Sequence, residues 1–160
     1  MSESAIATIA LVLHSLSAVV WVGGMFFALM ALRPSTAPLE PGPRLELWSR
    51  VLSRFFAWVI AAIVLLLASG YGMIFGAFGG FRGIGLHVHV MQGLGILMML
   101  LFFHLYFAPW RRFRAAVARQ DNPAAARQLG QIRAIVTINL ILGLITVAVG
   151  SSGRYWGYSG

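Results

Sequence analysis

The sequence predicts an all-α protein, an integral membrane bundle of four antiparallel helices. Two observations lead to this fold class: 59% of the 160 residues are hydrophobic while 10% are charged, and the apolar residues gather in four long runs. A hydrocarbon core of about 30 Å needs roughly 20 apolar residues per helix, and only helices or closed barrels satisfy their backbone groups in lipid. We therefore predict a single transmembrane domain over residues 1–160, with membrane helices at 5–32, 55–77, 86–108 and 134–150.

The first run is predicted to be a retained membrane helix rather than a signal peptide, because no basic residue precedes it and its apolar stretch is longer than roughly 7 to 15 residues. Four prolines in "RPSTAPLEPGPR" end this helix and predict an irregular loop within 33–54. The Gly-rich "GAFGGFRGIG" predicts a tight turn before the third helix. In the connection 109–133, Asn122 before Pro123 is typical of an N-cap followed by N1, so the fourth helix is expected to begin there.

The positive charge is concentrated at one side of the predicted bundle. All twelve basic residues are arginines, and ten of them lie in the connections 33–54 and 109–133, whereas Arg82 and Arg154 lie on the other side. The positive-inside rule then predicts cytoplasmic connections and periplasmic termini in a bacterial-type inner membrane. Membrane topology and attraction to anionic lipid account for the arginines, so we expect a lipid bilayer as partner and no nucleic acid.

Several kinds of chemistry are excluded. The chain has no cysteine, which excludes disulfides, thiolate metal sites, covalently attached c-type haem and cysteine nucleophiles. The four acidic residues all lie outside the apolar runs, so no carboxylate is placed for acid–base chemistry within the membrane. No serine has the supporting acid and base of a hydrolase. The four histidines therefore become the candidate functional residues.

Two histidines are predicted to lie at the same depth. His14 is 18 residues before Leu32 and His89 is 19 residues before Ala108, so at about 1.5 Å per residue both stand roughly 27 to 28 Å from the cytoplasmic ends of their helices. His104 lies near the cytoplasmic end instead, where it could hydrogen-bond Asn139.

Helical rotation separates the histidines of the third helix. At about 100° per residue, His87 and His89 point roughly 160° apart, while His89 and His104 differ by about 60°. If His89 and His104 face the bundle, His87 faces lipid headgroups or the outer loop. Trp21 shares the face of His14, and Gly93 lies one turn below His89, which leaves room for a flat ligand between the helices.

Imidazoles from two helices, small neighbours and arginines at the rim favour haem b as the cofactor. In this hypothesis His14 and His89 bind iron, Trp21 and Gly93 line the site, and Arg82 and Arg154 pair with the propionates.

Copper is the alternative, because imidazole and thioether suit Cu(I). His14, His87 and His89 would then receive the metal, His104 would lie near the exit, and a continuous relay would need Met25, Met98 or Met99. A purely structural membrane subunit is a third possibility.

Two family resemblances bear on this choice. The stretch "LHSLSAVVWVGGMFFALMALRP" resembles the first helix of the CopD copper-resistance family, in which a histidine is followed by tryptophan and a glycine pair. Together with "LHVHVMQGLGILMMLLFFHLYF", this order of features is similar to the HemJ family of haem-binding protoporphyrinogen oxidases.

The HemJ resemblance implies that His14 is a haem ligand and that His87 matches the histidine opening the third helix. His89 stands where that family has lysine, a departure that argues against porphyrinogen oxidation and makes bis-histidine ligation easier. The CopD resemblance implies copper uptake or resistance.

The functional prediction is a haem protein with a redox role, a candidate haem-dependent oxidoreductase. It would exchange electrons with a quinone, a porphyrinogen or a periplasmic partner, because bis-histidine iron favours electron transfer. A CopD-type copper permease is the alternative.

Overall fold

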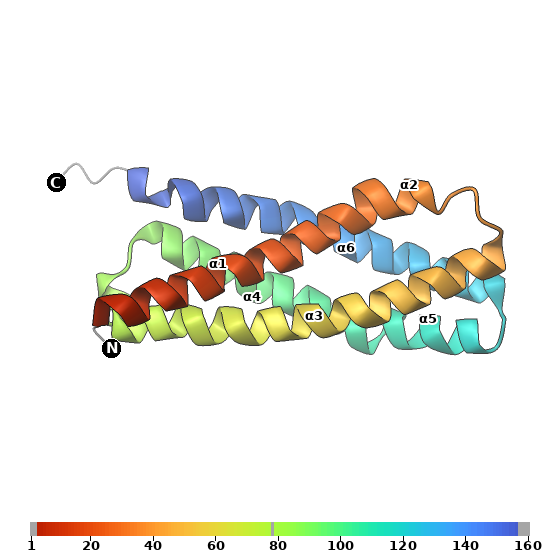
Figure 1. Cartoon of the computed structure of the whole chain (residues 1–160), viewed down its shortest axis with the longest axis horizontal. Coiled ribbons are helices and arrows are strands. Elements are labelled where there is room, and N and C mark those ends of the chain that lie inside the picture. Colours follow the sequence, from red (N-terminus) through yellow and green to blue (C-terminus); the bar gives the residue numbers. More distant parts are fainter. Residues whose placement is uncertain (1–2, 78, 157–160) are drawn as a thin grey trace.

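The computed structural model describes residues 3–77 and 79–156 and confirms the all-α fold class. Four helical rods run antiparallel, each long and apolar enough to cross a membrane (Figure 1). In the first rod, α1 (Glu3–Phe27) continues through a π-helical turn, η1 (Ala28–Leu32), into α2 (Arg33–Ser35). The second rod is α3 (Pro41–Gly76).

A short 3₁₀ turn, η2 (Phe81–Gly83), leads to the third rod. This rod consists of α4 (Leu86–Phe107) and α5 (Pro109–Ala118), separated at Ala108. The fourth rod is α6 (Asn122–Ser152), extended by the 3₁₀ turn η3 (Gly153–Tyr155). Both ends of the described chain lie at one end of the bundle, which we call the terminal end; the opposite end, with the connections 36–40 and 119–121, is the arginine-rich end (Figure 1).

The helices extend well beyond the apolar runs at the arginine-rich end, which corrects the predicted bounds. The connections expected at 33–54 and 109–133 shrink to 36–40 and 119–121, because α3 begins at Pro41, α5 fills 109–118 and α6 begins at Asn122. A continuous apolar run in the sequence marks only the part of a helix that is apolar on all sides, so the amphipathic extensions of the helices were not included in the predicted bounds. The extensions are amphipathic: α3 buries Leu45, Trp48 and Leu52 at helical spacing while Arg50 stays exposed.

The start of α6 was predicted within one residue, but its cap was not. Asp121, rather than Asn122, caps the helix, since its Oδ1 accepts a hydrogen bond of 3.0 Å from the Ala124 amide. Pro123 lies in the first turn, where its missing N–H costs no helical hydrogen bond.

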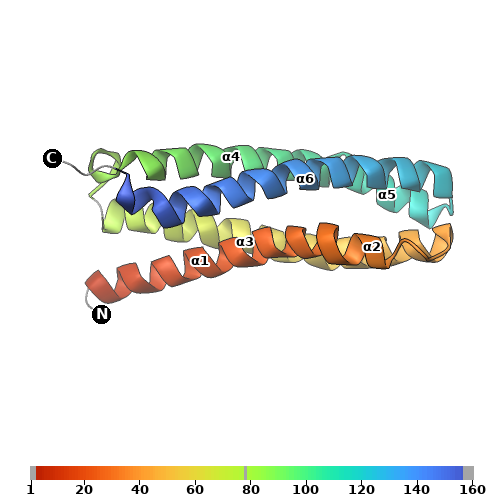
Figure 2. The same ribbon diagram turned by 90° about the horizontal axis from the view of Figure 1, so that it is seen from above.

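The core lies mainly in the arginine-rich half. Phe56 of α3 is nearly fully buried, and its ring lies 5.6 Å from that of Phe102 on α4 and 5.1 Å from that of Trp110 on α5. Counted inward from the terminal end, the first buried residue among those described in α1 is Ser17, and the first buried residue of α4 is Met98. Figure 2 shows α1 diverging from α4 and α6 in that direction.

Helix pairing is uneven. The main partner of α1 is α3, whereas both α4 and α5 pack on α6. A shorter stretch of α1 also contacts α6. α1 and α4 have no extensive contact, and Figure 2 places them on opposite sides of the bundle. This arrangement decides which histidines can meet.

Candidate functional site

His14 is half-buried and faces α3. Its Nδ1 lies 3.1 Å from the hydroxyl oxygen of Ser69. Gly70 passes beside the same ring, where an added Cβ would stand 3.2 Å from His14 Cε1 and crowd it. The imidazole is therefore held between a hydroxyl and a glycine on the neighbouring helix.

The hydrogen bonds of Ser69 favour one tautomer of His14. The Ser69 hydroxyl donates to the carbonyl of Leu65 at 2.5 Å, one helical turn earlier. A hydroxyl has one hydrogen, so toward His14 it can act only as acceptor. This acceptor role favours the tautomer with the proton on Nδ1 and the lone pair on Nε2, and the ring also has a hydrogen bond with the backbone of Leu66. A ring oriented through Nδ1 with Nε2 free is a common arrangement for a metal-ligating histidine.

His87 and His89 point opposite ways, as helical geometry predicts, but the inward and outward faces are reversed. The ring of His87 lies against Gly153 of η3, so closely that any Cβ there would overlap it. His89 and His104 are exposed on α4. The face of α4 that meets α6 carries Met91, which packs on Gly150, and this packing turns His87 inward.

The expected pairing of His104 with Asn139 is wrong. Asn139 is buried, and its Nδ2 donates to the backbone carbonyl of Met98 at 3.1 Å. Among the described residues its Oδ1 has no hydrogen-bond partner. Met98 is itself buried, with its sulfur 3.9 Å from the Thr146 hydroxyl, so a small polar cluster joins α4 to α6 at mid-bundle.

The other predicted lining residues do not gather around His14. Trp21 is a core residue, packed edge-on against Phe102 with ring centroids 6.2 Å apart. Gly93 is exposed and has no atom within 4 Å of an added Cβ. Arg82 is exposed in η2. Arg154 belongs to η3, and its side chain lies outside the described part of the structure.

Bis-histidine haem bound by His14 and His89 of one chain does not fit this arrangement. His14 faces α3, whereas His89 lies on the exposed face of α4, on the opposite side of the bundle. Within residues 3–77 and 79–156, no three His, Cys, Asp or Glu side chains are grouped to bind a metal ion. The candidate donor atom is Nε2 of His14, the ring nitrogen that Ser69 does not contact.

Two polar contacts of the terminal half were not found from the sequence. Ser69 orients His14, and the Tyr71 hydroxyl accepts a hydrogen bond of 3.1 Å from Gln92 of α4. The signal was present in "LLLASGYGM", where polar residues interrupt an apolar run. A polar side chain within a membrane helix is expected to have a partner on another helix.

Comparison with known families gives one match. The family model of copper resistance protein D, CopD, matches residues 49–152, which is more than half of the chain and contains His87, His89 and His104 but not His14. Searches of curated proteins and of solved structures found no match. The resemblance to the HemJ family stays a prediction.

Proposed function

The chain belongs to the copper resistance protein D family, and on this premise we propose that it takes up copper at its terminal end, with the His14 imidazole as the first protein ligand. The observation that supports the proposal is the hydrogen-bonded pair of His14 and Ser69, which orients the ring through Nδ1 and makes Nε2 the candidate metal ligand. Copper is the substrate in this proposal, not a resident cofactor. Cu(I) accepts neutral imidazole and thioether ligands.

The proposed membrane orientation follows from the arginines. Ten of the twelve lie toward the arginine-rich end, which the positive-inside rule assigns to the cytoplasm. The terminal end and His14 then face the periplasmic side of a bacterial-type inner membrane. Copper would meet the protein from outside.

The distribution of soft donors supports uptake from this side. The thioether of Met91 lies in the terminal half against Gly150, and the buried Met98 and Met25 lie deeper in the bundle. Below Met98 the aromatic rings around Phe56 fill the core. In this proposal copper would move from the His14 imidazole to the buried thioethers of Met25 and Met98, and passage beyond Phe56 would require the core to rearrange.

Haem b is the second candidate, because the same free Nε2 of His14 is a ligand atom for haem iron. The second imidazole ligand would have to come from a histidine other than His89 of the same chain. A redox exchange with a quinone, a porphyrinogen or a periplasmic partner belongs to this candidate alone.

The deciding experiment measures copper binding and colour on one sample. The full chain is purified in detergent, titrated with Cu(I) against a chromophoric chelator, and analysed for iron and for its oxidised and reduced absorption spectra. We expect copper binding that is lost in His14→Ala and weakened about 10- to 100-fold in Ser69→Ala, because the orienting partner is removed. Ser69→Thr keeps a hydroxyl and should retain binding.

His104→Ala is the matched control, since this exposed histidine lies at the arginine-rich end of α4. It should bind copper at the terminal end like the wild type, because it lies at the opposite end of the bundle from His14. A wild type that binds Cu(I) no better than His14→Ala overturns the proposal. Iron with a sharp reduced α-band, lost in His14→Ala, would replace copper by haem.

A further inference from the structure

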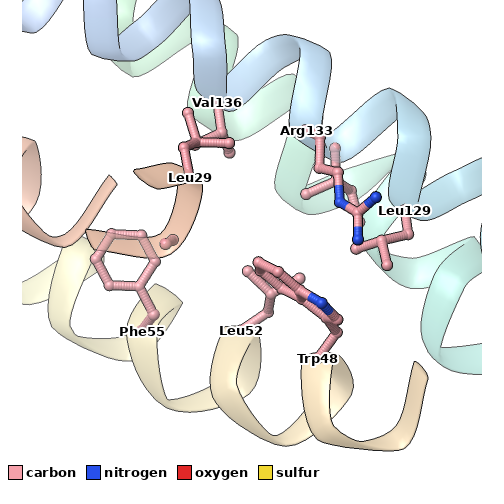
Figure 3. Close-up of a pocket in the computed structure, with 9 residues that line it drawn as sticks. Leu29, Trp48, Leu52, Phe55, Leu129, Arg133 and Val136 are labelled. Atoms are coloured by element: carbon pink, nitrogen blue, oxygen red, sulfur yellow. The ribbon is translucent and has the colours of Figure 1, made fainter. Parts of the chain in front are cut away.

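An apolar crevice at the arginine-rich half contains one cationic group. It is a small gap between the π-helical turn η1, α3 and α6 (Figure 3). Leu29, Leu52, Phe55 and Val136 line it with apolar surface, and Arg133 reaches in from α6. Most of its lining residues are buried, and the partly exposed ones among them are Phe55 and Arg133.

Arg133 is oriented but not neutralised. Its guanidinium carbon lies 5.2 Å from the centroid of the Trp48 ring, a cation–π contact. Its Nε is buried and has no hydrogen-bond partner among the described residues. The Trp48 ring is itself fixed, because it is buried and its Nε1 donates to Thr36 at 3.1 Å.

The charge around the crevice is positive. Arg33 at the start of α2 and Arg44 in α3 lie close enough to Arg133 for their charges to act on it. None of these three arginines forms an ion pair with a carboxylate in the part of the chain that the structure describes, where Glu46 pairs with Arg50. Three helices therefore contribute positive charge that no acidic side chain balances.

We propose that an anionic phospholipid binds at the mouth of this crevice, with its phosphate on the Arg133 guanidinium, near Arg33 and Arg44, and its acyl chain against the partly exposed Phe55 ring. A guanidinium presents a planar set of donors that matches two phosphate oxygens. A phosphate there would balance the positive charge of the three arginines. The π-helical turn supports the assignment, since such turns are frequent at functional sites.

The binding site would anchor the bundle at one level of the bilayer. Anionic lipid is attracted to the cytoplasmic surface, the side that the arginines predict for this end. A lipid bound between η1, α3 and α6 would also tie three rods together beside the core. The proposal is independent of whether copper or haem binds His14.

The test uses the full chain, delipidated in detergent and titrated in mixed micelles with phosphatidylglycerol or phosphatidylcholine while its melting temperature is followed. Phosphatidylglycerol should raise the melting temperature at low molar ratio, and phosphatidylcholine should not. Arg133→Gln should weaken the apparent phosphatidylglycerol affinity about tenfold or more, since a hydrogen-bonded charged contact is lost. Glycerol phosphate, which has no acyl chain, should have no effect.

Arg114→Gln is the matched control, because Arg114 also lies over a tryptophan, 5.8 Å from the Trp110 ring, but is exposed and outside the crevice. It should change the affinity less than twofold. Equal weakening by Arg133→Gln and Arg114→Gln, or an equal response to both lipids, overturns the proposal in favour of diffuse attraction.

A second measurement covers the case in which Arg133→Gln does not fold. Native mass spectrometry of the wild type in equimolar phosphatidylglycerol and phosphatidylcholine should show one phosphatidylglycerol retained per chain. Retention of a quinone or of phosphatidylcholine instead contradicts the assignment.

Discussion

The two halves of the bundle differ in the side chains that join their helices. In the arginine-rich half, Phe56 meets the rings of Phe102, Tyr106 and Trp110 within 6.2 Å. In the terminal half, the contacts between helices include polar ones, His14 with Ser69 and Tyr71 with Gln92. The oriented imidazole thus lies where few apolar side chains are buried.

This difference separates the residues that hold the fold from those available for chemistry. Binding sites are drawn from regions of lower local stability, because a ligand needs groups that are not already occupied by packing. The core around Phe56 can hold the four rods together while the terminal half keeps a free ring nitrogen. Variants in the two halves should therefore affect different measurements.

The largest expected effect is that of Phe56→Ala. Removing this buried ring should lower the free energy of unfolding by about 3 to 5 kcal/mol, because a cavity remains among the neighbouring rings. Phe26→Ala is the control, since Phe26 is 52% exposed in the first rod. Unfolding in one detergent, followed by circular dichroism, measures both; equal losses would mean that the arginine-rich half has no special core.

A smaller effect is expected where α1, α4 and α6 meet. An added Cβ at Gly143 would stand 2.8 Å from Val22 of α1 and 3.2 Å from Met98 of α4, so Gly143→Ala should destabilise the protein by about 1 to 3 kcal/mol through overpacking. Gly130→Ala on the same helix meets nothing within 4 Å. It should instead stabilise α6 by about 0.5 to 1 kcal/mol.

The same unfolding experiment measures both glycine variants. If Gly143→Ala were as stable as Gly130→Ala, the close approach of the three helices at mid-bundle would be refuted. The helices would then be less tightly packed around Gly143 than the structure describes.

The smallest effect is expected for the surface ion pair of the arginine-rich half. Arg50 and Glu46 are 3.1 Å apart, with side chains 76% and 56% exposed. Glu46→Gln should therefore lower the free energy of unfolding by only about 0.2 to 0.5 kcal/mol. A loss comparable to that of Phe56→Ala would show that surface charge, rather than aromatic packing, holds this half together.

Part of the candidate site followed from the sequence. Helical rotation correctly separated His87 from His89, because the angle between two positions of one helix depends only on their spacing. It did not determine which of them faces inward. That choice depends on α6, where Gly150 and Gly153 admit Met91 and His87. The predicted contact of His104 with Asn139 was wrong because it too depended on which face of α4 packs against α6.

By itself the sequence determined the membrane character, the four rods and the side on which the arginines gather, since hydropathy and charge are properties of residues taken in order. Only the tertiary structure decided that Ser69 stands beside His14 and that Arg133 lies over Trp48. Both contacts join residues more than 50 positions apart. A helix that is apolar nearly all round has no periodic stripe to show its inner face, so packing between helices sets its rotation.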